Sequence, residues 1–124
     1  MPELPEVETV RRGLADLLPG QAVVRATVFD SPKSFPNSPT DVQQFLYGAH
    51  VTAVRRRAKV LMIDLDTRYS LVIHLKMTGQ LIFRGANSFA GGHPNDSLIG
   101  ELPDRSTRVQ IDFTDGSRLF FNDQ

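Results

Sequence analysis

The second half of the chain contains short runs of β-branched and aromatic residues separated by turn-forming residues, and this pattern constrains the fold most. Apolar and polar residues alternate from Arg108 to Phe113, and Asp115-Gly116 then favours a hairpin turn into a further run. No helical pattern separates successive runs, so we expect the strands to pair antiparallel rather than through helical crossovers. The predicted strands span residues 50–57, 60–66, 70–75, 80–84, 108–113 and 118–121.

Two helices are predicted in the first half of the chain. Pro5, followed by acidic residues, is typical of a first helical turn, and Pro19-Gly20 ends the helical pattern. The apolar residues of this segment share one helical stripe at Val7, Val10, Leu14 and Leu17. A short second helix is predicted over 40–47, after a loop at 30–40 that is rich in Pro and Ser. The expected fold is mainly β, an antiparallel β-sandwich flanked by an N-terminal helix and a second short helix.

The composition limits the classes of protein to which the chain can belong. Its 124 residues, 40% of them hydrophobic, suit a single domain with one core. The absence of cysteine excludes disulfides and zinc sites built on thiolates, and three scattered histidines argue against any metal site. No stretch approaches the roughly 20 apolar residues of a membrane helix, and the acidic N-terminus differs from a secretory signal. We expect a cytoplasmic protein that does not associate with membranes.

The charges balance overall but are unevenly placed. The 14 basic residues equal the 14 acidic ones, whereas proteins that bind nucleic acids usually carry a basic surplus. However, four of the basic residues lie within five positions, at Arg55, Arg56, Arg57 and Lys59. A local basic patch that suits an anionic partner is therefore compatible with the neutral total.

The first three residues offer an unusual chemical group. Removal of Met1 would give Pro2 a free secondary amine, which attacks carbons at the aldehyde oxidation level to form iminium ions. Glu3 beside it could act as a general acid or base, and the start of the following helix would attract phosphate. Taken alone, this segment is more simply interpreted as a lead into the helix, with acidic residues that stabilise its first turn.

Four strings of residues change that interpretation. In the order MPELPEVETVRRGL, RRRAKVLMIDL, HLKMTGQL and LFFND, the chain resembles the formamidopyrimidine-DNA glycosylase and endonuclease VIII family over nearly its whole length. Leu4 is similar to the formamidopyrimidine branch, whose substrates are oxidised purines, whereas the other branch more often has glycine there and prefers oxidised pyrimidines. The resemblance implies that 1–124 is the N-terminal catalytic domain of a bifunctional DNA glycosylase and abasic-site lyase of base excision repair.

The resemblance also implies roles for individual residues. Pro2 would be the nucleophile that forms a Schiff base with C1′ of the damaged nucleotide, Glu3 would transfer protons at the sugar, and Glu6 would support the site. Lys59 would contact the target's phosphate and take part in the lyase steps. Met77 would fill the gap left by the flipped base, where an apolar wedge limits the cost of unstacking.

Further DNA contacts are expected from Arg56, Arg108 and His74, each with an alternative. Strand alternation lets only part of the arginine run face DNA. Arg108 follows Ser106-Thr107, where relatives often show a histidine pair, and could replace a phosphate contact but not a proton transfer. His74 could instead be a structural histidine.

Lys59 and Met77 also have structural alternatives. Lys59 could be a solvated charge on the polar face of a strand. Met77 continues the alternation of Leu71, Ile73 and Leu75, and could therefore extend the core face of that strand.

The partner implied is damaged double-stranded DNA, bound by a monomer without a small-molecule cofactor in a bacterial nucleoid. The family's helix-two-turns-helix domain and structural zinc finger are absent from this sequence, so we expect the isolated domain to be weak or inactive, especially if Met1 is retained. Open alternatives are a damaged-DNA-binding module without catalysis, an endonuclease VIII-type enzyme for oxidised pyrimidines, and a sandwich that binds no DNA.

The segment 85–106 is longer than an ordinary connection between strands, so we expect either an ordered excursion or a mobile loop there.

Overall fold

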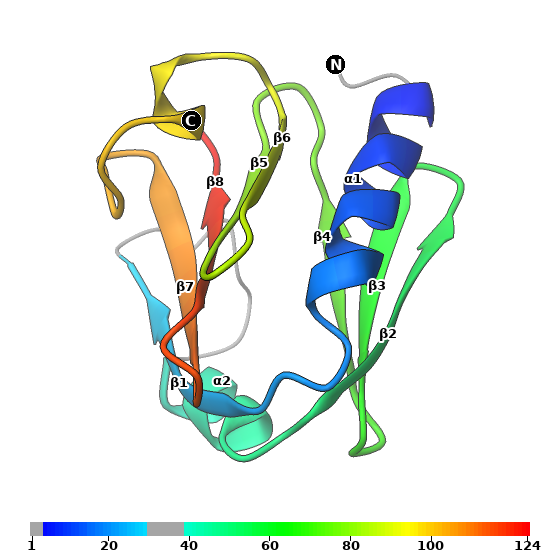
Figure 1. The fold of residues 1–124 in the computed structure, drawn as a ribbon, viewed down its shortest axis with the longest axis vertical. Coiled ribbons are helices and arrows are strands. Elements are labelled where there is room, and N and C mark those ends of the chain that lie inside the picture. Colours follow the sequence, from blue (N-terminus) through cyan, green and yellow to red (C-terminus); the bar gives the residue numbers. More distant parts are fainter. Residues whose placement is uncertain (1–3, 30–38) are drawn as a thin grey trace.

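A computed structural model describes residues 4–29 and 39–124. They form a sandwich of two antiparallel sheets, one with the strand order β1-β7-β8-β5-β6 and one with the order β2-β3-β4 (Figure 1). The predicted antiparallel sandwich with two helices is thereby confirmed. The elements are α1 (Leu4–Leu17), β1 (Val23–Val28), α2 (Pro39–Leu46), β2 (Val51–Arg57), β3 (Val60–Leu65), β4 (Ser70–His74), β5 (Gln80–Arg84), β6 (Phe89–Gly92), β7 (Thr107–Phe113) and β8 (Arg118–Asn122).

The core lies between the sheets because successive strand residues point to opposite faces. Every second residue of β7 is buried, and β3 shows the same period. The rings of Phe83 on β5 and Phe113 on β7, two strands of the same sheet, pack in the core with their centroids 6.2 Å apart. Val7, Val10 and Leu14 of the predicted helical stripe are buried, but Leu18 rather than Leu17 is the fourth fully buried member. The spacing of four residues from Leu14 keeps Leu18 on the same helical face.

Helix α1 closes one flank of the sandwich, where it contacts edge strands of both sheets, β2 and β6. Two glycines allow the close approach on the β6 side. A Cβ on Gly13 would lie 2.3 Å from the ring of Phe89, and a Cβ on Gly91 would lie 2.7 Å from the side chain of Val10. Helix α1 is therefore packed closely against β6 while it also contacts β2.

The strand patterns did not predict β1 and β6. Strand β6 has the sequence FAGG, which carries little β propensity, and it forms by antiparallel pairing with β5. It belongs to the segment 85–106, which is an ordered excursion that also contains a short 3₁₀ helix (Asp96–Leu98). The side-chain amide of buried Gln80 donates to the carbonyl of His93 at 2.6 Å and to Asn95 Oδ1 at 2.8 Å. These bonds anchor the excursion to β5.

Candidate functional site

The segments that carry the predicted site residues reach the same end of the sandwich. Figure 1 shows the start of α1, the β2–β3 turn at Ala58-Lys59, the β4–β5 turn at 76–78 and the end of the chain after β8 all at the top of the view. The predicted catalytic residues Pro2 and Glu3 lie outside the described residues, so their roles stay predictions. The helix that they precede is described from Leu4.

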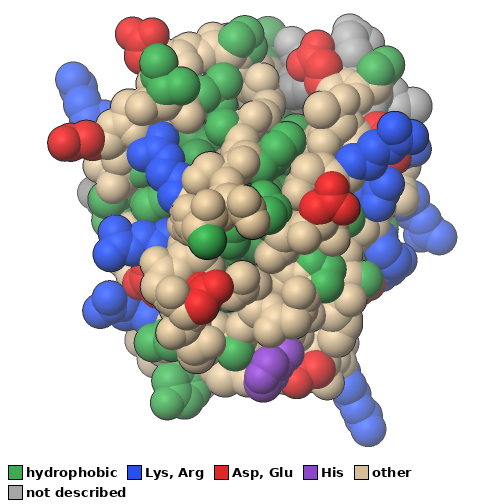
Figure 2. Space-filling model, in the orientation of Figure 1, with side chains coloured by type: hydrophobic (Ala, Val, Ile, Leu, Met, Phe, Trp, Pro, Cys, Tyr) green, Lys and Arg blue, Asp and Glu red, His purple; other side chains and the backbone are tan. Residues whose placement is uncertain are grey.

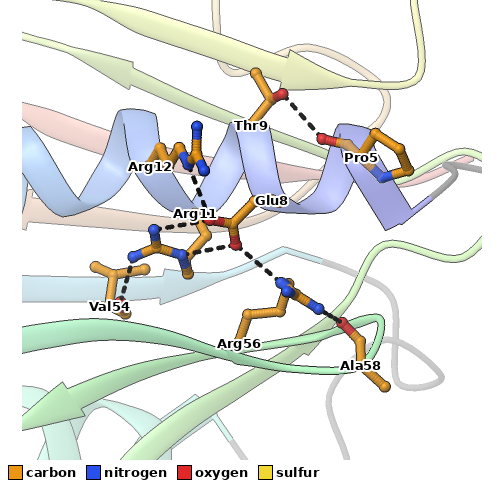
Figure 3. Close-up of polar contacts among 8 residues, drawn as sticks. All are labelled: Pro5, Glu8, Thr9, Arg11, Arg12, Val54, Arg56 and Ala58. Atoms are coloured by element: carbon orange, nitrogen blue, oxygen red, sulfur yellow. Dashed lines mark hydrogen bonds and ion pairs between the residues drawn. The ribbon is translucent and has the colours of Figure 1, made fainter.

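Glu8 forms the centre of a charged cluster on the side of α1 that faces β2 (Figure 3). Its carboxylate accepts from Arg11 Nε at 2.8 Å and Arg12 Nε at 3.0 Å on the helix, and from Arg56 Nε at 2.9 Å on β2. The hydrogen bonds from Arg11 and then Arg56 are the main reasons why the pKa of the Glu8 carboxyl lies far below its ordinary value. Glu8 is therefore a fixed negative charge at neutral pH.

Arg56 connects that cluster to the β2–β3 turn. Besides Glu8, its guanidinium donates from Nη1 to the backbone carbonyl of Ala58 at 2.9 Å, and 27% of the side chain is exposed. The DNA contact predicted for Arg56 stays a prediction. The structure adds that two of its donor nitrogens are already engaged inside the protein.

Lys59 lies in the β2–β3 turn, between the predicted strands 50–57 and 60–66, so the alternative that it is a charge on a strand face is wrong. Arg57 pairs with Val60 across the hairpin, which leaves Ala58 and Lys59 as the two turn residues. Such turns require a positive φ, and Ala58 supplies it at 52°. Lys59 is half-buried, and within the part of the chain that the structure describes its ammonium has no hydrogen-bond or ion-pair partner.

Met77 lies in the β4–β5 turn, and 66% of its side chain is exposed. The alternative that it extends the core face is wrong, because β4 ends at His74 and Lys76 turns the chain with a φ of 56°. The turn is tight, since Gly79 N donates to the carbonyl of Leu75 at 2.8 Å and a Cβ on Gly79 would lie 2.4 Å from that oxygen. Met77 therefore projects from a closely held loop.

The Met77 turn is also joined to the end of β8. The Thr78 hydroxyl donates to a carboxylate oxygen of Asp123, and the Gln124 backbone N–H donates back to the Thr78 hydroxyl oxygen at 3.3 Å. Arg108 on β7 donates from Nε to the carbonyl of Asp123 at 2.7 Å. The chain that leaves β8 is thus held between β7 and the turn that presents Met77.

His74 and Arg108 line one cavity of about 390 Å³ at the flank of the sandwich opposite α1. Its interior is apolar and comes from both sheets, and Lys76 and Asp123 also line it. His74 and Arg108 lie on different sheets, and the structure brings both to this cavity. Glu6, the remaining candidate, is exposed in the first turn of α1. The roles predicted for all three stay predictions.

Glu8, Thr78 and Asp123 are site residues that the sequence patterns missed. The helical spacing of Glu8 to Arg11 and Arg12, three and four positions, gave part of the signal for Glu8. No sequence pattern indicated the contact between Thr78 and Asp123, because the two residues are 45 positions apart. Among residues 4–29 and 39–124, no group of three or more His, Asp or Glu side chains could hold a metal ion, and no helix is long and apolar enough to cross a membrane.

The arrangement defines a class of domain, a two-sheet antiparallel sandwich in which the start of α1, the β2–β3 hairpin turn and the β4–β5 connection between the sheets converge at one end. Comparison with known proteins gives the family. The family model of the formamidopyrimidine-DNA glycosylase N-terminal domain matches residues 1–124. The chain belongs to this family, and the resemblance predicted from its sequence motifs is confirmed.

Curated relatives are substantially longer than this chain. The formamidopyrimidine-DNA glycosylase of Jannaschia sp. (strain CCS1) is 43% identical over 99% of this chain and 41% of that protein. The protein of the same name from Chloroflexus aurantiacus is 39% identical over 100% of this chain and 40% of its own length. The chain thus spans about two fifths of the relatives that it matches.

Solved structures agree with this assignment. A crystal structure of a complex between wild-type Lactococcus lactis Fpg and DNA containing an oxidized pyrimidine superposes with a TM-score of 0.78 at 25% identity. It covers 98% of this chain and 40% of that one. A complex of the G226P mutant of the same protein with DNA containing Fapy-dG gives the same TM-score, identity and coverage.

Proposed function

We propose that this chain serves as the N-terminal catalytic domain of a bifunctional DNA glycosylase and abasic-site lyase, which removes oxidised purines from damaged duplex DNA in base excision repair. The match of the family model to residues 1–124 is the observation that carries the proposal. The geometry supports it, because the helix that follows Pro2 and the turns that carry Lys59 and Met77 meet at one end of the sandwich.

The reaction begins at the nitrogen of Pro2 once Met1 has been removed. Its lone pair forms a bond to C1′ while the glycosidic bond breaks, and the departing base keeps the bonding electrons and takes up a proton. The proline nitrogen then loses its own proton. Opening of the sugar ring, with a proton delivered to the ring oxygen by Glu3, produces the iminium ion. A tertiary amide at this nitrogen could not begin the sequence, because its lone pair is delocalised into the carbonyl.

Lys59 and Met77 act on different parts of the DNA. The half-buried Lys59 has an ammonium without a partner among the described residues, which suits a phosphate oxygen of the target nucleotide. Met77 is exposed on a held turn, as a wedge that enters a base stack must be. Glu6, Arg56, Arg108 and His74 remain proposed as supporting residues around them.

The electrostatics permit this partner despite the neutral total charge. Figure 2 shows Lys and Arg side chains gathered at both sides of the view, with acidic side chains dispersed among other residues. We propose that the protein acts in the cytoplasm as a monomer and without a small-molecule cofactor. The chain contains no cysteine that could form a thiolate zinc site.

Borohydride trapping on duplex DNA with an abasic site tests the nucleophile. Intact mass spectrometry first gives the fraction of molecules that lack Met1, and the yield of reduced protein–DNA adduct should rise in proportion to that fraction. Equal trapping by protein that fully retains Met1 would exclude Pro2 and direct attention to a lysine. Binding of damaged DNA without any trapping by Met1-free protein would instead support a binding module without catalysis.

The lesion class has its own test. The two Lactococcus lactis Fpg complexes contain DNA with an oxidized pyrimidine and with Fapy-dG, so both lesion types deserve comparison. We expect single-turnover base release to be faster from a duplex with a formamidopyrimidine than from one with an oxidised pyrimidine. The reverse order would favour the endonuclease VIII-type alternative.

A further inference from the structure

We infer that Glu8 and Arg56 are positioning residues that hold the Lys59 turn at a fixed place against the start of α1. This inference rests on the proposed function, because it matters only if Lys59 acts on a nucleotide that is attacked from the N-terminal side of α1. It also gives Arg56 a role different from the DNA contact that the basic run suggested.

The guanidinium of Arg56 reaches two segments at once. Its Nε donates to Glu8 on α1 and its Nη1 donates to the carbonyl of Ala58, both at 2.9 Å (Figure 3). Ala58 immediately precedes Lys59 and adopts a φ of 52°. A planar guanidinium that bonds on two sides fixes both distance and direction, which a single flexible ammonium cannot do.

The Glu8 end of this link is itself held in place. Arg11 bonds both carboxylate oxygens of Glu8, at 2.8 and 2.9 Å, and Arg12 adds a third bond from the next helical position. The first turns of α1 are in turn packed on the core through Val7 and Val10, each 1% exposed. The chain of contacts therefore runs from the packed helix through Glu8 and Arg56 to the turn.

Arg55 provides a matched comparison on the same strand. It precedes Arg56 and points to the other face of the sheet, where its Nη2 donates to Asp64 Oδ1 at 2.9 Å on neighbouring β3. Asp64 is held further by the hydroxyl of Ser70. Arg55 thus has an ion pair of the same kind that touches neither α1 nor the β2–β3 turn.

The experiment measures single-turnover borohydride trapping on abasic duplex DNA at saturating protein, using the protein as encoded by its gene with Met1 removed. We expect Arg56→Met and Glu8→Gln each to lower the rate by about tenfold, since small misplacements of catalytic groups have effects of this order or larger. Arg56→Lys should recover part of the loss. Arg55→Met should trap at the wild-type rate.

Two further readouts separate positioning from DNA contact and from general loss of structure. If Arg56 acts through Lys59, then Arg56→Met should cause no further loss in a Lys59→Ala background. The salt dependence of DNA affinity should stay unchanged in Arg56→Met, whereas loss of a phosphate contact would reduce its slope by about one. Glu8→Gln keeps the helix and the shape of the side chain, so it tests the link even if Arg56→Met fails to fold.

The inference is overturned if Glu8→Gln traps at the wild-type rate, or if the reductions in trapping rate caused by Arg56→Met and Lys59→Ala multiply in the double variant. It is also overturned if Arg56→Met changes only the salt dependence of DNA affinity. A slow Arg55→Met would also overturn it, because any break in the strand's ion pairs would then suffice. Absence of trapping by the wild-type protein would contradict the proposed function itself, and is distinguishable from all of these outcomes.

Discussion

The two turns that carry Lys59 and Met77 share one backbone feature but are held by different interactions. In each, a residue with a positive φ directly precedes the candidate functional residue, with Ala58 at 52° and Lys76 at 56°. The Lys59 turn is attached to α1 by the ion pair of Arg56 with Glu8. The Met77 turn depends on close backbone packing at Gly79 and on the hydrogen bond from the Thr78 hydroxyl to Asp123, just after β8.

This difference matches the task proposed for each turn. A lysine that pairs with a phosphate needs a fixed direction, which charged hydrogen bonds supply while they leave the turn accessible. A wedge that enters a base stack must resist being pushed back, and steric contacts between backbone atoms resist such displacement. The comparison therefore predicts that the Met77 turn is sensitive to added volume and that the Lys59 turn is sensitive to charge.

The largest effect is expected from Gly79→Ala, which breaks the Met77 turn sterically. The new Cβ would lie 2.4 Å from the carbonyl oxygen of Leu75 and 2.7 Å from its Cα, and neither backbone atom can move without shifting the strand end. We expect a loss of about 3 kcal/mol in the free energy of unfolding, measured by urea denaturation. Gly20→Ala is the control, because it has open space and only a positive φ to oppose it, and should cost about 1 kcal/mol. Equal losses would contradict a steric role for Gly79.

Lys59→Ala should have the next largest effect, on activity rather than stability. Removal of an ammonium that pairs with the target phosphate should reduce base release and strand cleavage by about a hundredfold. The melting temperature should stay nearly constant, since the side chain has no internal partner among the described residues and packs in no core. A drop of many degrees with cleavage intact would show that Lys59 is structural.

Thr78→Val should produce a smaller change at the other turn. It removes the hydroxyl that donates to Asp123, and the free energy of unfolding should fall by about 1 kcal/mol. Amide hydrogen exchange should become faster at Met77 and Gln124. Thr52→Val is the control, because its hydroxyl donates to the Asp64 carbonyl at 3.3 Å on the exposed face of the other sheet. Unchanged exchange at the Met77 turn would show that the bond to Asp123 does not hold it.

The smallest effect is the contribution of the Glu8 cluster to the pH dependence of stability. Because the folded state lowers the pKa of Glu8, its ion pairs contribute stability above the ordinary value of 4.5, and this stability is lost as the pH falls below that value. The charged groups around it are Arg11, Arg12 and Arg56, with Asp16 near Arg11. Unfolding measured between pH 7 and pH 3 should show a shallower decline for Glu8→Gln than for the wild-type protein. Parallel declines would mean that other carboxylates account for the acid sensitivity.

Much of the sandwich could be predicted from local patterns. The alternation along β7 and the Asp115-Gly116 turn predicted the β7–β8 hairpin, which the structure confirms. Strand β6 could not be predicted, because FAGG has no alternation and its glycines are explained only by close approaches in the folded structure, of Gly91 to Val10 on α1 and of Gly92 to the backbone of Gly79. The break between β2 and β3 was predicted at residues 58–59, and the structure confirms it with Lys59 in the turn.

The sequence by itself determined the family, the two helices and most of the strands, because helical and strand periodicities and the specific opening motif are local properties. Only the tertiary structure decided which side chains meet at the site. Glu8 and Arg56 are 48 positions apart, and Thr78 and Asp123 are 45 apart. The first contact requires α1 to pack on the edge strand β2, and the second requires β5 to pair with β8 rather than with β4. This helix packing and this strand pairing both follow from burial of the whole core, which depends on all the segments together and not on any one of them.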